Sequence, residues 1–255
     1  MNLYQKLITT ITACLLATSP AQAFEVISAE DINTEGNGTR AYLDLSLNAE
    51  NQFLDKLTTD VGTEHFEDYT WATPADLSLT FPGAGTATLG GNGLVYSIEH
   101  IDGESEERRT KVARELYYGR YAASGSQYWQ TSASVGGSST FTINMTEDIA
   151  AFGFYAYDLG DFGGELAINL YQDGVLVGTI NNATHNLYAT TTSGGYSGSV
   201  VYIGIIGEQK EDGTYETFDK VEFKIINSNG TSEDFFAFDD MTIATPIQLK
   251  EIAAD

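Results

Sequence analysis

Apolar and polar residues alternate along most of this chain, in short runs that end at glycine, asparagine, aspartate or serine. A period of two residues is typical of β-strands with one buried and one exposed face. The pattern predicts strands at residues 41–47, 75–81, 94–100, 138–145, 151–159, 165–172, 199–206, 220–226 and 236–243. Turn residues recur about every ten positions, which predicts a single all-β domain of the β-sandwich or jelly-roll type.

Two local signals add detail to this pattern. Asp173-Gly174 lies between ELAINLYQ and VLVGTI and predicts a tight hairpin, because Asp-Gly favours the two-residue turns that join antiparallel strands. Residues 103–116, GESEERRTKVAREL, are the one helical candidate. Such a mixed-charge segment is more often a solvated surface helix or loop than a contact for an acidic partner.

The first 23 residues have the pattern of a secretory signal peptide. Lys6 precedes an apolar stretch, and Ala21-Gln22-Ala23 is a small-residue cleavage signal, so the mature chain is expected to start at Phe24. The alternative is a lipoprotein signal that would leave a lipid on Cys14. We expect a secreted protein, extracellular or on the cell surface, with the periplasm as the other option.

Cysteine usage and length limit the possible architectures. Cys14 is the only cysteine, so a mature chain from Phe24 has no disulfide, and its stability must come from a core or from metal ions. The mature chain is long enough to bury a sizeable core as one domain. The expected division is a signal peptide at 1–23, a β-sandwich at 24–247 and a polar tail at 248–255.

The chain is strongly acidic. Its formal charge is -24, and removal of Lys6 with the signal peptide makes it -25. This charge argues against nucleic acid and anionic membranes as partners, because both are negatively charged. It suits a protein that binds cations, and equally one that is simply soluble in salt water.

Six segments carry a resemblance to a known family: EHFEDYT, LTFPGAGTATLGG, GRYAASGSQYWQT, AFGFYAYDLGDFGGELAINLY, SGSVVYIGIIG and FFAFDDMTI, which together span residues 64–244. They resemble secreted bacterial β-sandwich proteins that often precede a PEP-CTERM sorting tail. The resemblance implies a jelly-roll fold similar to lectins and carbohydrate-binding modules, and no known catalytic reaction. The chain lacks the Pro-Glu-Pro motif, apolar helix and basic end of the sorted members, which favours free secretion.

The last predicted strand places two adjacent carboxylates in an apolar run, FFAFDDMTI. Strict alternation puts Asp239 on the face of Met241 and Asp240 on the face of Phe238, so both faces look buried. A buried carboxylate without a partner is costly, so at least one should have a strong partner. We predict calcium, which binds six to eight oxygen ligands. The Asp pair also resembles the aspartate that holds a structural calcium near the end of carbohydrate-binding jelly rolls.

Two further segments hold candidate calcium ligands. Asp158 and Asp161 lie beside glycines that let backbone carbonyls turn toward an ion. Asp31, Asn33 and Glu35 alternate as in the first half of an EF-hand loop, although the closing glutamate of that motif is missing. The alternative for both segments is that their side chains cap turns by accepting backbone N–H bonds.

An aromatic segment is the candidate carbohydrate site, because sugar rings stack on exposed aromatic faces and planar polar groups bond their hydroxyls. Residues 117–129 concentrate such side chains: Tyr117, Tyr118, Arg120, Tyr121, Gln127, Tyr128 and Trp129. The alternative is that these rings are half-buried sandwich residues with a polar tip. The sequence predicts at least one exposed platform among them.

Signals for catalysis are few. The three histidines, His65, His100 and His185, are far apart in sequence without zinc-type spacing, and the chain has no GxSxG motif. The resulting hypothesis is a calcium-stabilised, non-catalytic β-sandwich that binds extracellular polysaccharide. The alternative is a self-assembling structural protein of the extracellular matrix, a surface layer or a fibre, since exposed strand edges can pair between copies.

Overall fold

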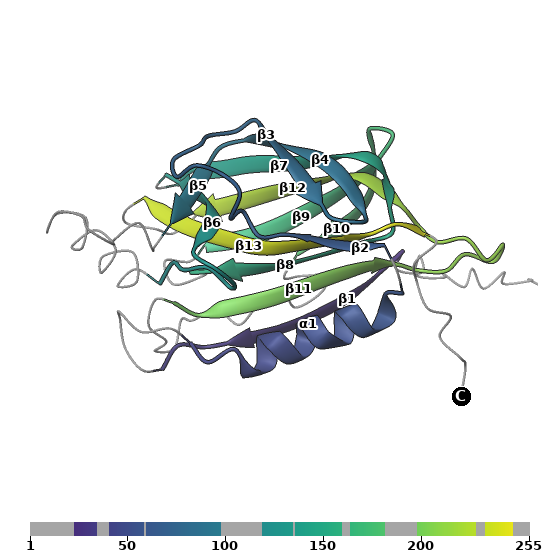
Figure 1. Ribbon diagram of the computed structural model, residues 1–255, viewed down its shortest axis with the longest axis horizontal. Coiled ribbons are helices and arrows are strands. Elements are labelled where there is room, and N and C mark those ends of the chain that lie inside the picture. The colour runs from purple at the N-terminus through teal and green to yellow at the C-terminus, as the bar shows by residue number, and fades with distance from the viewer. Residues whose placement is uncertain are drawn as a thin grey trace, which may run out of the picture.

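The alternating runs of the sequence form two antiparallel β-sheets that pack face to face (Figure 1). This computed structural model describes residues 23–34, 41–58, 60–97, 119–134, 136–159, 164–181, 198–227 and 233–246. Its elements are β1 (Phe24–Asp31), α1 (Asp44–Lys56), β2 (Val61–Glu64), β3 (Leu77–Phe81), β4 (Gly85–Gly91), β5 (Leu94–Ser97), β6 (Gln127–Ala133), β7 (Ser138–Ile149), β8 (Ala151–Tyr157), β9 (Gly164–Gln172), β10 (Val175–Ile180), β11 (Val200–Gly207), β12 (Phe218–Asn227) and β13 (Asp234–Ala244).

One sheet has seven strands and the other has six. The seven-stranded sheet has the order β1-β11-β8-β13-β6-β5, with β2 paired to one end of β13, and the six-stranded sheet has the order β10-β9-β12-β7-β4-β3. The expected all-β sandwich is therefore confirmed. Within the described ranges, no helix is long and apolar enough to cross a membrane.

Alternation along the strands builds the core between the sheets. Phe141 of β7 and Phe223 of β12 stack with ring centroids 4.3 Å apart, and Phe154 of β8 and Phe238 of β13 pack against them from the other sheet. All four rings are fully buried. Burial of each ring removes apolar surface from water, which is the main favourable term in folding.

Residues 41–47 were expected to form a strand, and this prediction is wrong. Residues 44–56 form α1, which buries Ser46, Ala49 and Phe53 on one stripe. The start of the helix is capped from a distance, since the carboxylate of Asp31 accepts the backbone N–H groups of Leu45 at 3.0 Å and Ser46 at 2.8 Å. A cap supplied by a different element leaves no local N-cap signal in the sequence.

Helix α1 lies on the outer face of the seven-stranded sheet, over β1 and β11 (Figure 1). Phe53 sits directly on the sheet at two glycines, Gly153 of β8 and Gly204 of β11, where a Cβ atom would meet its ring. The absence of side chains at these two positions lets the helix approach the sheet closely.

Most other strand predictions are confirmed. The runs at 75–81, 138–145, 151–159, 165–172, 199–206, 220–226 and 236–243 overlap β3, β7, β8, β9, β11, β12 and β13, and the run at 94–100 overlaps β5. The hairpin at Asp173-Gly174 is also confirmed, with both residues at positive φ. The sequence did not predict β1, β2, β4 or β6, and the helical candidate at 103–116 lies outside the described residues.

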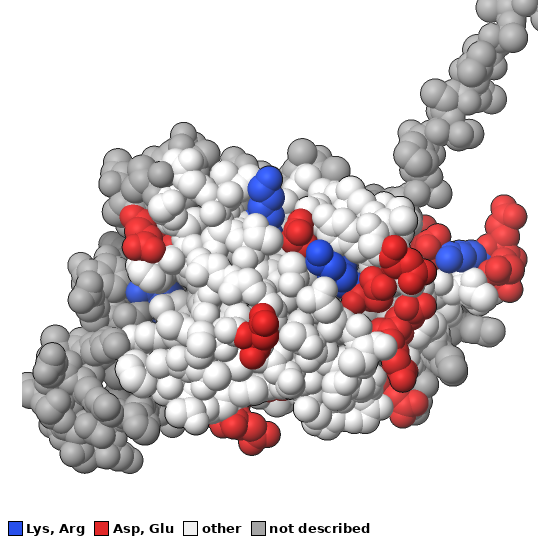
Figure 2. All heavy atoms as spheres, turned by 90° about the horizontal axis from the view of Figure 1, so that it is seen from above, with Lys and Arg blue, Asp and Glu red and all other residues white. Residues whose placement is uncertain are grey.

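Charge is unevenly spread over the surface. On the face seen in Figure 2, acidic side chains gather toward the right-hand end, while most of the centre is uncharged. The connection between β11 and β12 lies at that end of the molecule in Figure 1 and contains Glu208, Glu211, Asp212 and Glu216. The high net charge therefore does not form one continuous acidic surface on this face.

We expect Gly204→Ala to destabilise the protein. A Cβ atom there would lie 2.5 Å from the Phe53 ring, so the ring and α1 must shift. The expected loss in the free energy of unfolding is about 1–3 kcal/mol, measured by urea unfolding. Asn48→Ala, on the exposed side of α1, is the control and should change stability by less than about 0.5 kcal/mol. Unchanged stability of Gly204→Ala would contradict this packing.

Candidate functional site

Strand β13 changes partners at the two adjacent aspartates. Its first half, up to Phe238, pairs with β6, and its second half, from Met241, pairs with β2. On its other side β13 pairs with β8, and the register shifts by one residue between Asp239 and Thr242. This shift is a β-bulge, and Asp240 adopts a positive φ of 48° there.

The bulge reverses the alternation that the sequence predicts. Met241 and Ile243 lie in the same inter-sheet core as Phe236 and Phe238, so the inward positions skip Asp240. Strict alternation placed Asp239 with Met241 and Asp240 with Phe238, and this prediction is wrong. An extra residue in one strand returns the following side chains to the opposite face. The contacts of both aspartates accordingly lie with segments on the outer face of the seven-stranded sheet.

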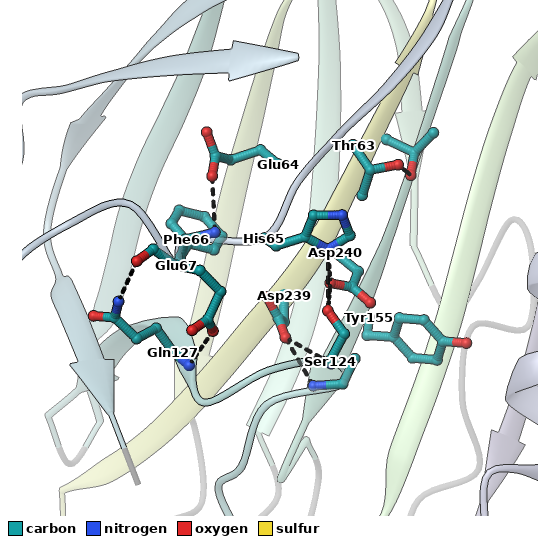
Figure 3. Close-up of polar contacts among 12 residues, drawn as sticks. Thr63, Glu64, His65, Phe66, Glu67, Ser124, Gln127, Tyr155, Asp239 and Asp240 are labelled. Atoms are coloured by element: carbon teal, nitrogen blue, oxygen red, sulfur yellow. Dashed lines mark hydrogen bonds and ion pairs between the residues drawn. The ribbon is translucent and has the colours of Figure 1, made fainter. Parts of the chain in front are cut away.

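Asp239 holds the segment that follows residue 118. Its Oδ2 accepts the backbone N–H of Ala123 at 2.7 Å and that of Ser124 at 3.3 Å (Figure 3). The side chain is completely buried, and its Oδ1 has no hydrogen-bond partner. Burial, with the neighbouring charge of Asp240, raises the pKa of Asp239 well above its ordinary value despite these backbone bonds.

Asp240 joins a histidine and a serine. Its Oδ1 lies 2.6 Å from Nδ1 of His65 and accepts the Ser124 hydroxyl at 2.7 Å, while Ser124 Oγ is 3.0 Å from the same Nδ1 (Figure 3). The Asp240 side chain is 10% exposed and that of His65 is 49% exposed. The hydrogen bond to Asp240 raises the pKa of His65, and partial burial opposes this only in part.

Helix α1 contributes a third carboxylate. Tyr155, directly opposite Asp239 in β8, donates its hydroxyl to Glu50 at 2.7 Å. Burial raises the pKa of Glu50, and the charge of Asp240 acts in the same direction. Leu47 and Leu54 lie one turn before and one turn after Glu50 and are both exposed, at 47% and 37%. Together these contacts define a polar cluster of six residues: Glu50, His65, Ser124, Tyr155, Asp239 and Asp240.

Two further glutamates fix the segments that carry His65 and Ser124. Glu64 accepts the backbone N–H groups of Phe66 at 2.8 Å and Thr80 at 3.1 Å. Glu67 accepts those of Ser126 at 2.7 Å and Gln127 at 2.6 Å (Figure 3). The backbone segments that carry His65 and Ser124 are thus held by further hydrogen bonds, which limits their movement.

The cluster contains serine, histidine and aspartate, but not in the arrangement of a catalytic triad. In a triad the aspartate bonds one ring nitrogen of histidine and the serine bonds the other. Here Asp240 and Ser124 both lie against Nδ1, and the Ser124 hydroxyl donates to the aspartate. The serine is therefore not placed to pass its proton to Nε2.

The groups bonded to the Asp pair are mostly not calcium ligands. Calcium requires oxygen ligands, whereas the atoms that face Asp239 and Asp240 are backbone N–H groups, an imidazole nitrogen and a hydroxyl that donates. No three His, Cys, Asp or Glu side chains gather as a metal site within the described residues. Protein groups bond one oxygen of each aspartate, and calcium binding at this strand stays a prediction.

The other candidate ligands have separate roles. Asp31 caps α1, and Asn33 is buried, with its backbone N–H bonded to Ser199. Asp158 lies 3.7 Å from Arg120 in a buried ion pair and accepts the backbone N–H of Gly198 at 3.3 Å. The structure does not bring these residues together with the Asp pair. Asp161 and Glu35 lie outside the described residues.

The aromatic segment is mostly part of the core. Tyr121, Tyr128 and Trp129 are at most 1% exposed, so these three rings are not the exposed platform that the sequence predicts. Trp129 packs toward Phe141 between the sheets, because β6 continues the seven-stranded sheet there. Arg120 and Gln127 are also buried, and Tyr117 and Tyr118 lie outside the described residues.

Sequence analysis missed four members of the polar cluster: Glu50, His65, Ser124 and Tyr155. Glu50 lies in α1, His65 directly follows β2, Ser124 precedes β6 and Tyr155 lies in β8. No regular spacing along the chain relates the four positions. Three of them, His65, Ser124 and Tyr155, lie in segments of the family resemblance, whereas Glu50 lies outside all six segments.

Comparisons with known proteins give only distant similarities. No family model and no curated protein matches the chain. Among solved structures, the K2 cleaved adhesin domain of Lys-gingipain is 16% identical with a TM-score of 0.40, over 72% of this chain and 98% of that one. TmCBM61 in complex with β-1,4-galactotriose is 11% identical with a TM-score of 0.30, over 62% and 86%. Caldicellulosiruptor saccharolyticus CBM27-1 in complex with mannohexaose is 13% identical with a TM-score of 0.28, over 75% and 93%. Values this low carry no implication for function.

We expect the folded state to become more stable as the pH falls from about 8 to about 5. The pKa of His65 is raised from 6.5 and that of Glu50 from 4.5, so the folded chain binds both protons more tightly than the unfolded chain. Each contribution is complete below the ordinary value and is lost as the pH rises through the raised one. The raised pKa of Asp239 acts in the same direction. Urea unfolding at both pH values measures the effect.

His65→Gln tests the origin of this pH dependence, because glutamine does not titrate. It should reduce the stability gained between the two pH values, whereas Glu211→Gln, on the exposed β11–β12 connection, should leave it unchanged. A wild-type protein that loses stability over the same fall in pH would contradict the assignment.

We expect Asp239→Ala to lower the free energy of unfolding by about 1–3 kcal/mol, because it removes the acceptor of two backbone N–H groups. Asp239→Asn keeps a carbonyl acceptor and removes the buried charge, so its cost should stay below about 1 kcal/mol.

For the wild type, the free energy of unfolding should be the same in chelator and in millimolar calcium. A gain with calcium that Asp239→Asn abolishes would show that the aspartates hold an ion.

Proposed function

We propose that this protein is a secreted β-sandwich that binds extracellular carbohydrate, without catalysis, through the polar cluster. The observation that carries the proposal is the half-exposed His65 bonded to Asp240, together with the Glu50 carboxylate of α1, which bonds Tyr155 and interacts electrostatically with both. The signal-peptide pattern of residues 1–23 supports the secretion part of the proposal.

The chemistry of the cluster suits sugar hydroxyls, each of which donates and accepts hydrogen bonds. Asp240 and Glu50 supply carboxylate acceptors, and Ser124 and His65 supply groups that donate or accept. Leu47 and Leu54, on either side of Glu50, offer exposed apolar surface for the C–H face of a sugar ring. A few placed polar groups beside apolar surface are typical of small-ligand sites.

A fixed site also lowers the cost of binding. The segments that carry His65 and Ser124 are held by Glu64 and Glu67, so few side chains need to lose freedom when a ligand binds. The arrangement of Ser124, His65 and Asp240 around one ring nitrogen supports binding over nucleophilic catalysis.

Self-assembly is the second candidate function, and one observation favours it. Strand β10 is an edge of the six-stranded sheet, and its first residues, Val175 and Leu176, are 64% and 52% exposed. An exposed apolar edge can pair with the edge of another copy. The bulge between Leu176 and Gly178 opposes this, because bulges on edge strands hinder pairing.

We expect affinity electrophoresis against a panel of neutral, acidic and amino polysaccharides to retard the purified protein with at least one of them. Asp240→Ala and His65→Ala should weaken that binding about tenfold or more, because each removes a hydrogen-bonding group from the cluster. Circular dichroism checks that each variant is folded, and Glu211→Gln is the matched surface control.

Three outcomes would count against this function. Absence of retardation by every polysaccharide, binding that ignores both cluster variants, or release of reducing sugar from the panel would each contradict it. Sedimentation of the same samples tests the second candidate, which requires concentration-dependent association.

A further inference from the structure

The polar cluster holds three carboxyl groups and one histidine. Asp240 interacts electrostatically with Asp239 and with Glu50, and, within the described part of the chain, His65 is the cationic group that acts on Glu50 and Asp240. Among the described residues no lysine or arginine pairs with these carboxylates. Lys56 pairs with Glu25 and Arg120 with Asp158.

The carboxylates retain free acceptor capacity. Tyr155 bonds Oε2 of Glu50, and both bonds to Asp240 use Oδ1, so one oxygen of each group receives no bond from the described residues. Beneath them, three fully enclosed polar atoms have no hydrogen-bond partner: Asp239 Oδ1, Tyr157 Oη and Tyr202 Oη. The enclosed atoms are out of reach of a ligand, whereas the two unbonded oxygens of Glu50 and Asp240 can accept hydrogen bonds from a ligand that brings donors and positive charge.

We propose that the cluster binds a glycan that carries ammonium groups, of the glucosamine type, in preference to neutral or anionic glycans. This inference rests on the proposed carbohydrate binding and names its ligand class. An ammonium group offers three N–H donors and no acceptor, which matches the unbonded oxygens of Glu50 and Asp240. Uronate or sulfate groups would meet like charge and are disfavoured.

A metal ion fits the same charge less well than an ammonium group does. No three ligating side chains gather in the part of the chain that the structure describes, and N–H and O–H donors already face the aspartates. An ammonium group needs two or three acceptors in place of the six to eight oxygens of calcium. The exposed Leu47 and Leu54 add apolar contact that a free ion would not use.

The test compares glucosamine oligomers with N-acetylglucosamine oligomers of equal length, because the two differ only at the nitrogen on C2, which is an ammonium group in one and a neutral acetamido group in the other. Isothermal titration at about physiological ionic strength should give at least about tenfold tighter binding of the glucosamine oligomer. Glu50→Gln and Asp240→Asn should each abolish most of that preference. Glu211→Gln removes the same charge elsewhere on the surface and should leave the preference intact.

The other outcomes distinguish a failure of the ammonium preference from a failure of carbohydrate binding. Equal binding of both oligomers that Asp240→Asn weakens would overturn the ammonium preference and leave carbohydrate binding standing. If a lysine oligopeptide binds as tightly as the glucosamine oligomer, or if Glu211→Gln reduces the preference as much as Glu50→Gln does, the attraction is a general one of cations to an acidic protein. Either result would overturn the ammonium preference. Binding of neither oligomer while a neutral polysaccharide binds would overturn it as well. Failure of every glycan would remove both proposals.

Discussion

The hydrogen bonds from the backbone of Ala123 and Ser124 to the buried Asp239 are the constraint on which the outer face of the seven-stranded sheet depends. They hold residues 123–124 beside β13 at the point where the pairing of β13 with β6 stops and its pairing with β2 starts. The bulge at the same point turns Asp240 to this face, where it meets His65 and Ser124. Without the bulge, one carboxylate would point into the apolar core between the sheets.

This arrangement places charge where the protein compensates it only in part. The pKa values of Asp239 and Glu50 are raised because burial disfavours their charged forms, and nearby Asp240 adds to the effect. A protein selected for stability alone has simpler solutions, such as an asparagine that accepts the same backbone bonds. Perturbed carboxylates at a partly exposed position are typical of functional sites, which is why the polar cluster carries the proposals made for this molecule.

Strand prediction succeeded where one face of a strand is buried in the core and the other faces outward. In β12, Val221, Phe223 and Ile225 face the core and their neighbours face outward, so the period of two residues is visible in the sequence. It failed at residues 41–47, where leucines alternate although the segment starts a helix that is capped by Asp31. It also failed to distinguish buried from exposed aromatic rings at Tyr121, Tyr128 and Trp129, because tyrosine and tryptophan suit both environments.

The sequence by itself determined the class of fold and showed that Asp239 and Asp240 are buried carboxylates that need partners. Hydrophobic alternation and turn residues act locally, so they predict strands, the hairpin at Asp173-Gly174 and a buried acidic pair. Only the tertiary structure decided which groups satisfy that pair. The bulge depends on how β13 pairs with β8, and the partners come from segments more than a hundred residues away in sequence. Hydrogen bonds between distant segments depend on sheet order and register, and neither is written in local periodicity.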